Sequence, residues 1–168
     1  MKETPVLEAS LELFETLRQI SFFSALKEAQ IVDIFRVSKI RRFDAGETII
    51  PEGAFDTYLY VLLTGIVEVV KQGNTLATLN APGEIFGELS ILNCAARSAS
   101  VVTISKTSCL AVDASFLENL LPSDRVPVHA AVYKVFAEIV SNRLRTTSED
   151  LTQAREEIRF LRAALARR

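Results

Sequence analysis

Between Lys39 and Val112 the sequence consists of short β-branched runs separated by turn residues. The six runs are Thr48–Ile50, Tyr58–Leu63, Ile66–Val70, Thr75–Leu79, Ser100–Ile104 and Cys109–Val112. Gly, Pro, Asn or Asp stand between most of them, as in Pro51-Glu52-Gly53. Many short strands at near-regular spacing are typical of a β-barrel or sandwich. We therefore expect a mostly β domain over residues 39–121, with flanking helices.

The region before these strands has a helical pattern. Apolar residues recur at helical spacing from Val6 to Phe35, with an interruption at Ser21–Ser24. The pattern predicts two helices around a tight connection. We assign residues 1–38 to this N-terminal helical segment.

The region after the strands is predicted to be mainly one long helix. A short helix is expected near Ser115–Leu121, then a break or hinge from Pro122 to Pro127, then a helix from about Val128 to the end. Seven apolar residues and Thr147 form a seam along it that steps by four and three, as in a coiled coil: Val140, Leu144, Thr147, Leu151, Ala154, Ile158, Leu161 and Leu165. About 40 helical residues span roughly 60 Å, more than a small β domain can cover. Residues 122–168 therefore predict a homodimer through this helix; packing along its own β domain is the alternative.

Composition argues against several classes of protein. The net charge is −2, and residues 141–168 hold seven arginines against four acidic residues, which is more typical of a solvated coiled-coil face than of a DNA arm. We expect no direct nucleic-acid contact. The longest apolar run, Tyr58–Val70, is too short to span a bilayer, so no membrane insertion is expected. An acidic N-terminus and only two cysteines, Cys94 and Cys109, favour the cytoplasm.

Catalytic and metal sites lack the residues that they need. His129 is the only histidine, so a cupin-like metal centre or a Ser-His-Asp hydrolase has little support. The two cysteines lack metal-site spacing, which also disfavours haem or iron–sulfur sensing. We expect a protein that is not an enzyme and binds no metal.

Phe86–Val101, between two predicted strands, carries the chemistry of a phosphate cradle. Its opening Gly87-Glu88-Leu89 can form a short helix whose free N–H groups face an anion, and Arg97 can offer a planar fork to two phosphate oxygens. Glu88 can accept a hydrogen bond from a sugar hydroxyl. An acid and an arginine flanking one ligand predict a ligand with both hydroxyl and phosphate groups, such as a ribose phosphate.

With these residues the chain resembles the cyclic nucleotide-binding family, and the resemblance covers nearly all of it. Phe43–Gly53 is similar to the family's first hairpin, Thr64–Val69 to its glycine-turn strand, and residues 86–101 to its phosphate-binding cassette. The resemblance implies a jelly-roll-like β-roll. It also implies that Glu88 holds the ribose 2′-hydroxyl and that Arg97 holds the exocyclic phosphate oxygens, with Ser98 and Ala99 completing the shell. Ala54 departs from the family, where Asp is frequent.

The long helix resembles one branch, the bacterial catabolite activator proteins. The stretch Asn142–Leu151, including Arg143, is similar to the part of their dimer helix that supplies a Thr to the adenine and a Ser from the partner subunit. This implies those roles for Thr147 and Ser148, and favours cyclic AMP. Cyclic GMP is the alternative ligand, because Ser98 could reach a guanine amino group. Thr147 is also the one polar residue of the apolar seam, so it could instead set the register of a coiled coil.

The expected function is therefore an intracellular cyclic nucleotide sensor that passes ligand binding to its dimer helix. Catabolite activators continue into a helix-turn-helix, which these 168 residues do not contain. We expect output through an unknown protein partner in trans, or a place in a longer product such as a transcription regulator. A ligand-free dimeric interaction module with a degenerate site is the alternative.

Overall fold

The computed structural model describes residues 2–6, 17, 20, 23, 26–93, 95–120 and 122–165. The chain divides into two compact units, residues 1–133 and 134–168, and each is described by itself. The N-terminal prediction of two helices falls largely on residues 7–25, most of which lie outside the described residues. Its second helix is present as α3, Glu28–Val37.

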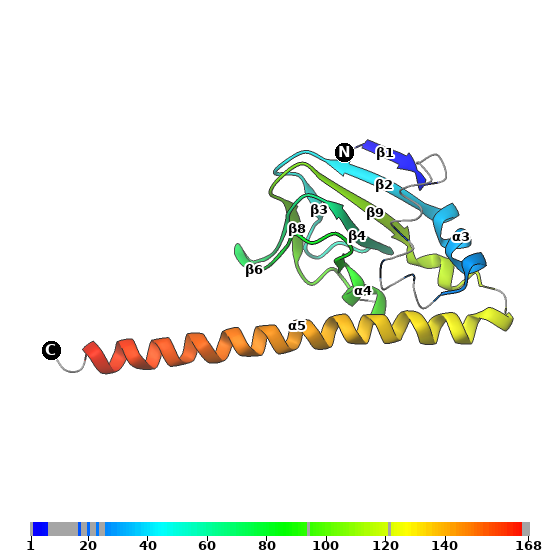
Figure 1. The fold of residues 1–168 in the computed structure, drawn as a ribbon. Coiled ribbons are helices and arrows are strands. Elements are labelled where there is room, and N and C mark those ends of the chain that lie inside the picture. Colours follow the sequence, from blue (N-terminus) through cyan, green and yellow to red (C-terminus); the bar gives the residue numbers. More distant parts are fainter. Residues whose placement is uncertain are drawn as a thin grey trace. The chain divides into compact units, whose positions relative to one another are not determined.

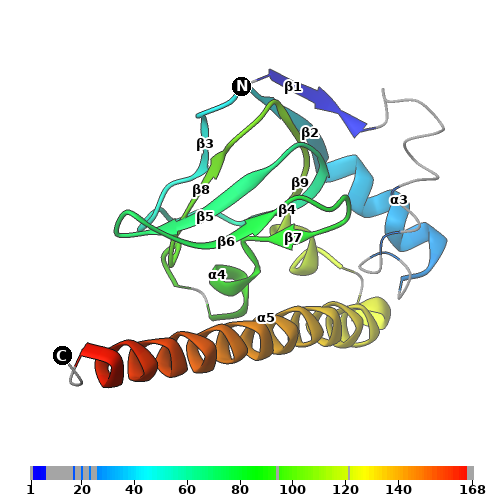
Figure 2. The ribbon, with the colours of Figure 1, turned by 60° about the vertical axis from the view of Figure 1, so that its left-hand side comes forward.

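Two antiparallel sheets make up the first unit (Figure 1, Figure 2). The five-stranded sheet has the order β1 (Lys2–Pro5), β2 (Ser38–Phe43), β9 (Thr107–Asp113), β4 (Tyr58–Thr64), β7 (Ile85–Phe86). The four-stranded sheet has the order β3 (Thr48–Ile50), β8 (Ser100–Thr103), β5 (Val67–Lys71), β6 (Asn74–Leu79). The predicted fold class, mostly β with flanking helices, is confirmed. Among the described strands the two sheets share no member, so they do not close into a barrel.

All six predicted β runs form strands, with ends that differ by at most two residues. Three strands were not predicted, namely β1, β2 and β7. β1 lies at the start of residues 1–38, the segment assigned as helical, just before the helical pattern that begins at Val6. It pairs with β2, and Glu3 contacts Lys39 Nζ at 3.0 Å and Arg41 Nε at 2.7 Å. β2 carries three basic residues, which hide its alternation, and β7 is only two residues long.

The hydrophobic core lies between the two sheets. It takes side chains from both: Phe43, Tyr60, Leu62, Phe86, Cys109 and Ala111 from one, and Ile49, Ile50, Val67, Leu79 and Val101 from the other. The rings of Tyr60 and Phe86 stack with centroids 5.3 Å apart. Helix α3 packs against β2 and β9 with Ile31, Ile34 and Phe35 buried. Each buried side chain of this size contributes about 1.5–3 kcal/mol, which holds the strand ends in place.

Two helical elements follow β9. The 3-10 helix η2 covers Ala114–Leu117, and helix α5 runs from Pro122 to Leu165. The predicted break between Pro122 and Pro127 is wrong, because the helix is continuous there. Pro122 occupies the first position, where a missing N–H costs nothing, and Pro127 lies near enough to the start that only one intrahelical hydrogen bond is lost.

Candidate functional site: a buried arginine in the phosphate-cradle loop

The predicted cradle occupies the connection between the two sheets. Phe86 ends β7, Gly87 turns the chain with φ +86°, α4 covers Glu88–Asn93, and β8 begins at Ser100. The two polar residues on which the prediction depends are both buried: Glu88 is 1% exposed and Arg97 is 3% exposed. Burying a charged group is costly unless it has partners, so those partners define the site.

All five N–H groups of the Arg97 guanidinium donate to protein oxygens. Nε donates to Asp56 Oδ2 at 3.2 Å, and Nη2 donates to Asp56 Oδ1 and, at 2.5 Å, to the Tyr58 carbonyl. Nη1 donates to the Gly87 carbonyl at 2.6 Å and to Ser90 Oγ at 2.7 Å. The structure thus brings together Gly87 and Arg97, two residues of the predicted cradle. Arg97 was predicted to offer a planar fork to phosphate, and in this structure the fork formed by Nε and Nη2 holds a carboxylate.

Asp56 is the site residue that the sequence did not reveal. It lies in the connection between β3 and β4, 41 residues from Arg97 along the chain. Its side chain is 32% exposed. Burial raises the pKa of Asp56, but the hydrogen bonds from Arg97 and from the Tyr58 amide, together with the nearby positive charge, lower it more, so the pKa lies below its usual value. The carboxylate is therefore ionised at neutral pH and neutralises the guanidinium.

Backbone hydrogen bonds fasten the same connection to the cradle. The amide of Gly53 donates to the Arg97 carbonyl at 2.8 Å, and the amide of Arg97 donates to the Ala54 carbonyl at 2.9 Å. The amide of Glu52 donates to Ser100 Oγ at 2.9 Å, at the start of β8. The two segments therefore form one hydrogen-bonded body, which fixes the backbone on both sides of the guanidinium.

Gly87 is required by both its conformation and its surroundings. A Cβ built there would lie 2.7 Å from Arg97 Nη1 and 3.2 Å from the Tyr58 carbonyl oxygen. Only a residue without a side chain lets the guanidinium approach the Gly87 carbonyl from this side. The opening glycine of the predicted cradle is thus explained by the packing of Arg97 against the backbone.

We predict that Gly87→Ala destabilises the protein more than Gly46→Ala does. Gly46 has a similar φ of +83°, but a Cβ added at Gly46 would have no neighbouring atom within 4 Å. Gly46→Ala should therefore cost about 1–2 kcal/mol for the left-handed backbone alone, and Gly87→Ala roughly 1–3 kcal/mol more for the clash. Urea unfolding of both variants measures the difference. Equal losses would show that the guanidinium does not need the space at Gly87.

The other predicted cradle residues differ in burial. Leu89 is exposed on α4, the Ser98 side chain is exposed, and Ala99 is partly buried. The buried carboxyl of Glu88 has interactions of its own, but the five hydrogen bonds of the guanidinium described above go to other residues. The carboxylate paired with Arg97 is that of Asp56.

The cyclic nucleotide-binding domain model matches residues 40–124, just over half of the chain. The chain belongs to the cyclic nucleotide-binding domain family. The predicted resemblance is thus confirmed, and the matched region contains the whole cradle. The family is a ligand-sensing module, not a catalytic one.

Individual relatives agree with this assignment. The chain is 26% identical over 141 residues to a CRP-like cAMP-activated global transcriptional regulator of Mycobacterium tuberculosis, covering 82% of this chain and 61% of the regulator. It is 30% identical over 122 residues to a cAMP-dependent protein kinase regulatory subunit of Blastocladiella emersonii, covering 70% and 30%. The fold is also similar to that of a cyclic nucleotide-binding domain from Methylobacillus flagellatus, whose crystal structure has a TM-score of 0.72 at 23% identity, covering 84% of this chain and 83% of that one. The chain spans about three fifths or less of the length of these two curated relatives.

A pocket of about 460 Å³ lies beside the cassette of this cyclic nucleotide-binding domain. Asp56 and Phe55 line it from the β3–β4 connection, Ser90 from α4, and His129 and Tyr133 from the start of α5. Asp56 and Ser90 are also partners of Arg97, so they separate the guanidinium from this pocket. His129 Nε2 donates to the Leu117 carbonyl at 3.1 Å, in agreement with a packing role.

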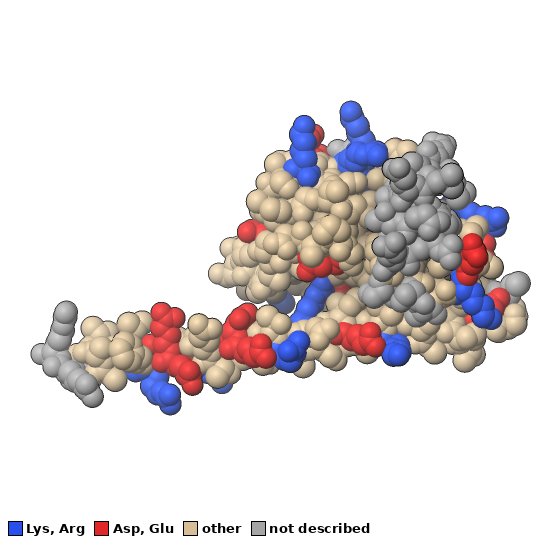
Figure 3. Space-filling view, in the orientation of Figure 1, with Lys and Arg blue, Asp and Glu red and all other residues tan. Residues whose placement is uncertain are grey.

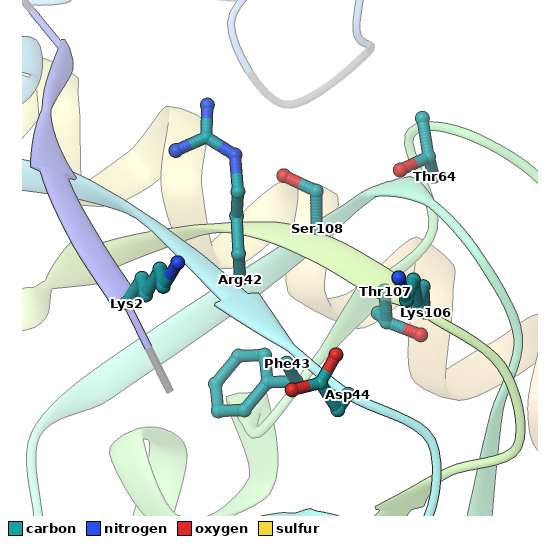
Figure 4. Close-up of a pocket in the computed structure, with 8 residues that line it drawn as sticks. All are labelled: Lys2, Arg42, Phe43, Asp44, Thr64, Lys106, Thr107 and Ser108. Carbon is teal, nitrogen blue, oxygen red and sulfur yellow. The ribbon is translucent and has the colours of Figure 1, made fainter.

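A second pocket, of about 450 Å³, is basic and lies away from the cassette (Figure 4). Residues paired in register across four neighbouring strands line it: Lys2, Arg42, Ser108 and Thr64. In Figure 4 Arg42, Ser108 and Thr64 project to the same side of the sheet. None of the predicted ligand residues lines it. Within the described part of the chain, no group of three or more His, Cys, Asp or Glu could hold a metal ion.

The second unit consists of most of α5. Its seam side chains at Leu144, Leu151, Ile158, Leu161 and Leu165 are each about half or more exposed. Basic and acidic side chains alternate along the helix (Figure 3). Thr147 and Ser148 are exposed, Arg143 is partly buried, and Ser148 Oγ donates to the Leu144 carbonyl at 2.7 Å. The roles predicted for these three residues stay predictions. No helix in the described residues is long and apolar enough to cross a membrane.

Proposed function

We propose that this chain is a cyclic nucleotide sensor in which Arg97 binds the phosphodiester and Glu88 binds a ribose hydroxyl. The observation that supports this most is the buried guanidinium, whose Nε and Nη2 together hold a two-oxygen anion. A phosphodiester offers two oxygens to the same fork and, like the carboxylate, forms short charge-assisted hydrogen bonds. The site therefore has the geometry and the charge that a cyclic phosphate needs.

Burial makes this contact selective for anions. Arg97 is 3% exposed, so a ligand there meets a cation that water screens poorly. An uncharged ligand could not compensate the guanidinium, and its binding would leave a buried charge unpaired. Glu88, equally buried, is suited to accept from a hydroxyl donor and to exclude a second phosphate. Gly87, Leu89, Ser98 and Ala99 are the remaining cradle positions that we propose to surround the ligand.

We further propose cyclic AMP as the preferred ligand and a homodimer through α5 as the form that binds it. The preference is supported by sequence similarity to two relatives whose names mention cAMP, the regulator of Mycobacterium tuberculosis and the kinase regulatory subunit of Blastocladiella emersonii. Thr147 and Ser148 would contact the base, and Arg143 would lie beside them on the same helix. Binding would bias the dimer helix, and the output would go to a protein partner in trans in the cytoplasm.

Calorimetric titration of the full chain with cyclic AMP, cyclic GMP and linear AMP tests this function. We expect saturable binding of cyclic AMP, weaker binding of cyclic GMP, and the weakest binding of linear AMP, whose terminal phosphate carries a second charge near Glu88. No saturable binding of any of the three would refute the sensor function.

The base preference has its own prediction. Thr147→Ala should weaken cyclic AMP binding by roughly 5- to 10-fold, because one hydrogen bond contributes about 1 kcal/mol, and should leave cyclic GMP binding less affected. Thr152→Ala is the matched control, since the Thr152 hydroxyl donates to the Ser148 carbonyl of its own helix at 2.8 Å. If both variants bind the two nucleotides as the wild type does, Thr147 sets coiled-coil register and does not read the base.

A second function, a ligand-free dimeric interaction module, is favoured by one observation. All five guanidinium N–H groups already have protein acceptors, so Arg97 has a structural role without any nucleotide. In that case the seam of α5 would be the functional surface. The same titration separates the two functions.

A further inference from the structure

We propose that the carboxylate of Asp56 competes with the ligand for Arg97, so that nucleotide binding requires this side chain to leave the guanidinium. The inference rests on the proposed function, because it concerns how a phosphodiester reaches the arginine. It adds a residue, Asp56, that sets the affinity of the site.

The competition follows from counting hydrogen-bond donors. A guanidinium has five N–H groups, and in Arg97 each already donates to a protein oxygen. A phosphodiester can gain a two-point contact only if two of these N–H groups lose their present acceptors. Asp56 is the one acceptor among these that holds two, through Nε and Nη2, and it is the one with a negative charge. An anionic ligand would also repel it.

Asp56 is the partner that can move with least disruption. The Tyr58 and Gly87 acceptors are backbone carbonyls, so their departure would displace strand β4 or the turn before α4. The Ser90 hydroxyl is a side-chain acceptor, but its departure would free only one N–H group and no charge. The Asp56 side chain belongs to a loop, is 32% exposed, and lines the pocket of about 460 Å³. Rotation of this side chain would place the carboxylate in that pocket, while the hydrogen bonds of Gly53 and Ala54 hold the loop backbone in place.

The arrangement also explains why the fold tolerates a buried arginine. A buried cation without a counter-ion is strongly destabilising, and Asp56 supplies that counter-ion. The low pKa of Asp56 agrees with a strong pair. The consequence is a reduced apparent affinity, because only molecules in which the carboxylate has left can bind. Asp56 would thus tune the nucleotide concentration at which the sensor responds.

The test is calorimetric titration of the full chain with cyclic AMP after Asp56→Asn and Asp56→Glu. Asparagine keeps the shape of the side chain and removes its charge, so the affinity of Asp56→Asn for cyclic AMP should rise by at least about tenfold. Glutamate keeps the charge, so the affinity of Asp56→Glu for cyclic AMP should stay within about threefold of the wild-type value. Asp113→Asn is the control, because Asp113 accepts from Thr57 Oγ1 at 2.8 Å and from the Ser115 amide at 3.0 Å, and neither contact involves Arg97. It should bind as the wild type does.

Thermal unfolding with and without cyclic AMP checks the same inference in protein that is shown to fold. Asp56→Asn should melt lower than the wild type without ligand and should gain more from saturating cyclic AMP. Unchanged or weaker binding of cyclic AMP by Asp56→Asn would overturn the inference. An equal gain in affinity in Asp56→Glu would also overturn it, because it would indicate an effect of packing and not of charge. If the wild type binds cyclic AMP and the Asp56 variants give either of these contrary results, only the proposed competition is refuted. If neither the wild type nor any variant binds, the proposed function fails as well.

Discussion

Replacing Arg97 with alanine should weaken cyclic AMP binding by at least about 100-fold. The change removes two charge-assisted hydrogen bonds to the phosphodiester, each of which contributes about 1.5–3 kcal/mol, and about 2.8 kcal/mol corresponds to 100-fold in affinity. Arg97→Lys should recover only part of this loss, because an ammonium keeps the charge but has no planar fork for two oxygens. Isothermal calorimetry on both variants measures the effect.

Loss of the fold must be separated from loss of the contact. Arg97→Ala leaves Asp56 and the Gly87 carbonyl without their buried donor, so the variant should also be less stable. Thermal unfolding must therefore show that each variant is folded at the titration temperature. Arg42→Ala serves as the control, since Arg42 is exposed on β2 and lines only the basic pocket. Unchanged affinity in a folded Arg97→Ala would refute the assignment of the phosphate site.

Replacing Leu151 with aspartate should convert the proposed dimer to a monomer. Leu151 is 50% exposed in the single chain and lies mid-seam, where a coiled coil would bury it against the same residue of the second copy. Fully burying a leucine contributes about 1.5–3 kcal/mol, and the variant places two carboxylates together at that position. We expect the dissociation constant of the dimer to rise by at least about 100-fold. Analytical ultracentrifugation over a range of concentrations measures it.

Gln153→Glu is the matched control for this change. It adds a negative charge two residues along the same helix, outside the seam, and should leave the assembly unaltered. A wild-type chain that sediments as a monomer at every concentration would contradict the dimer proposal. A Leu151→Asp variant that remains dimeric would show that the two copies associate elsewhere. Neither result would bear on Arg97, which belongs to the other unit.

The strands show which parts of a fold local pattern can predict. The six β-branched runs were found because alternation and turn residues are properties of a few neighbouring positions. β1 was missed because it forms by pairing with β2, whose partner residues lie at least 34 positions away along the chain. The break expected at Pro127 was wrong for a related reason. A proline near a helix start costs only one hydrogen bond, and the burial of Val128 and Val132 offsets that cost.

Sequence alone determined the family, the β-rich core and the segment, residues 86–101, that contains Gly87 and Arg97. These two residues are ten positions apart, on either side of α4, so their contact joins the two ends of one short segment. Only the tertiary structure decided that Asp56 holds the guanidinium. That contact joins residues 41 positions apart, through two sheets whose packing brings the β3–β4 connection over the cassette. A charge pair of this kind produces no periodic pattern in a sequence. It depends on where the fold places the two charged side chains in space, and not on the residues that neighbour each of them in the chain.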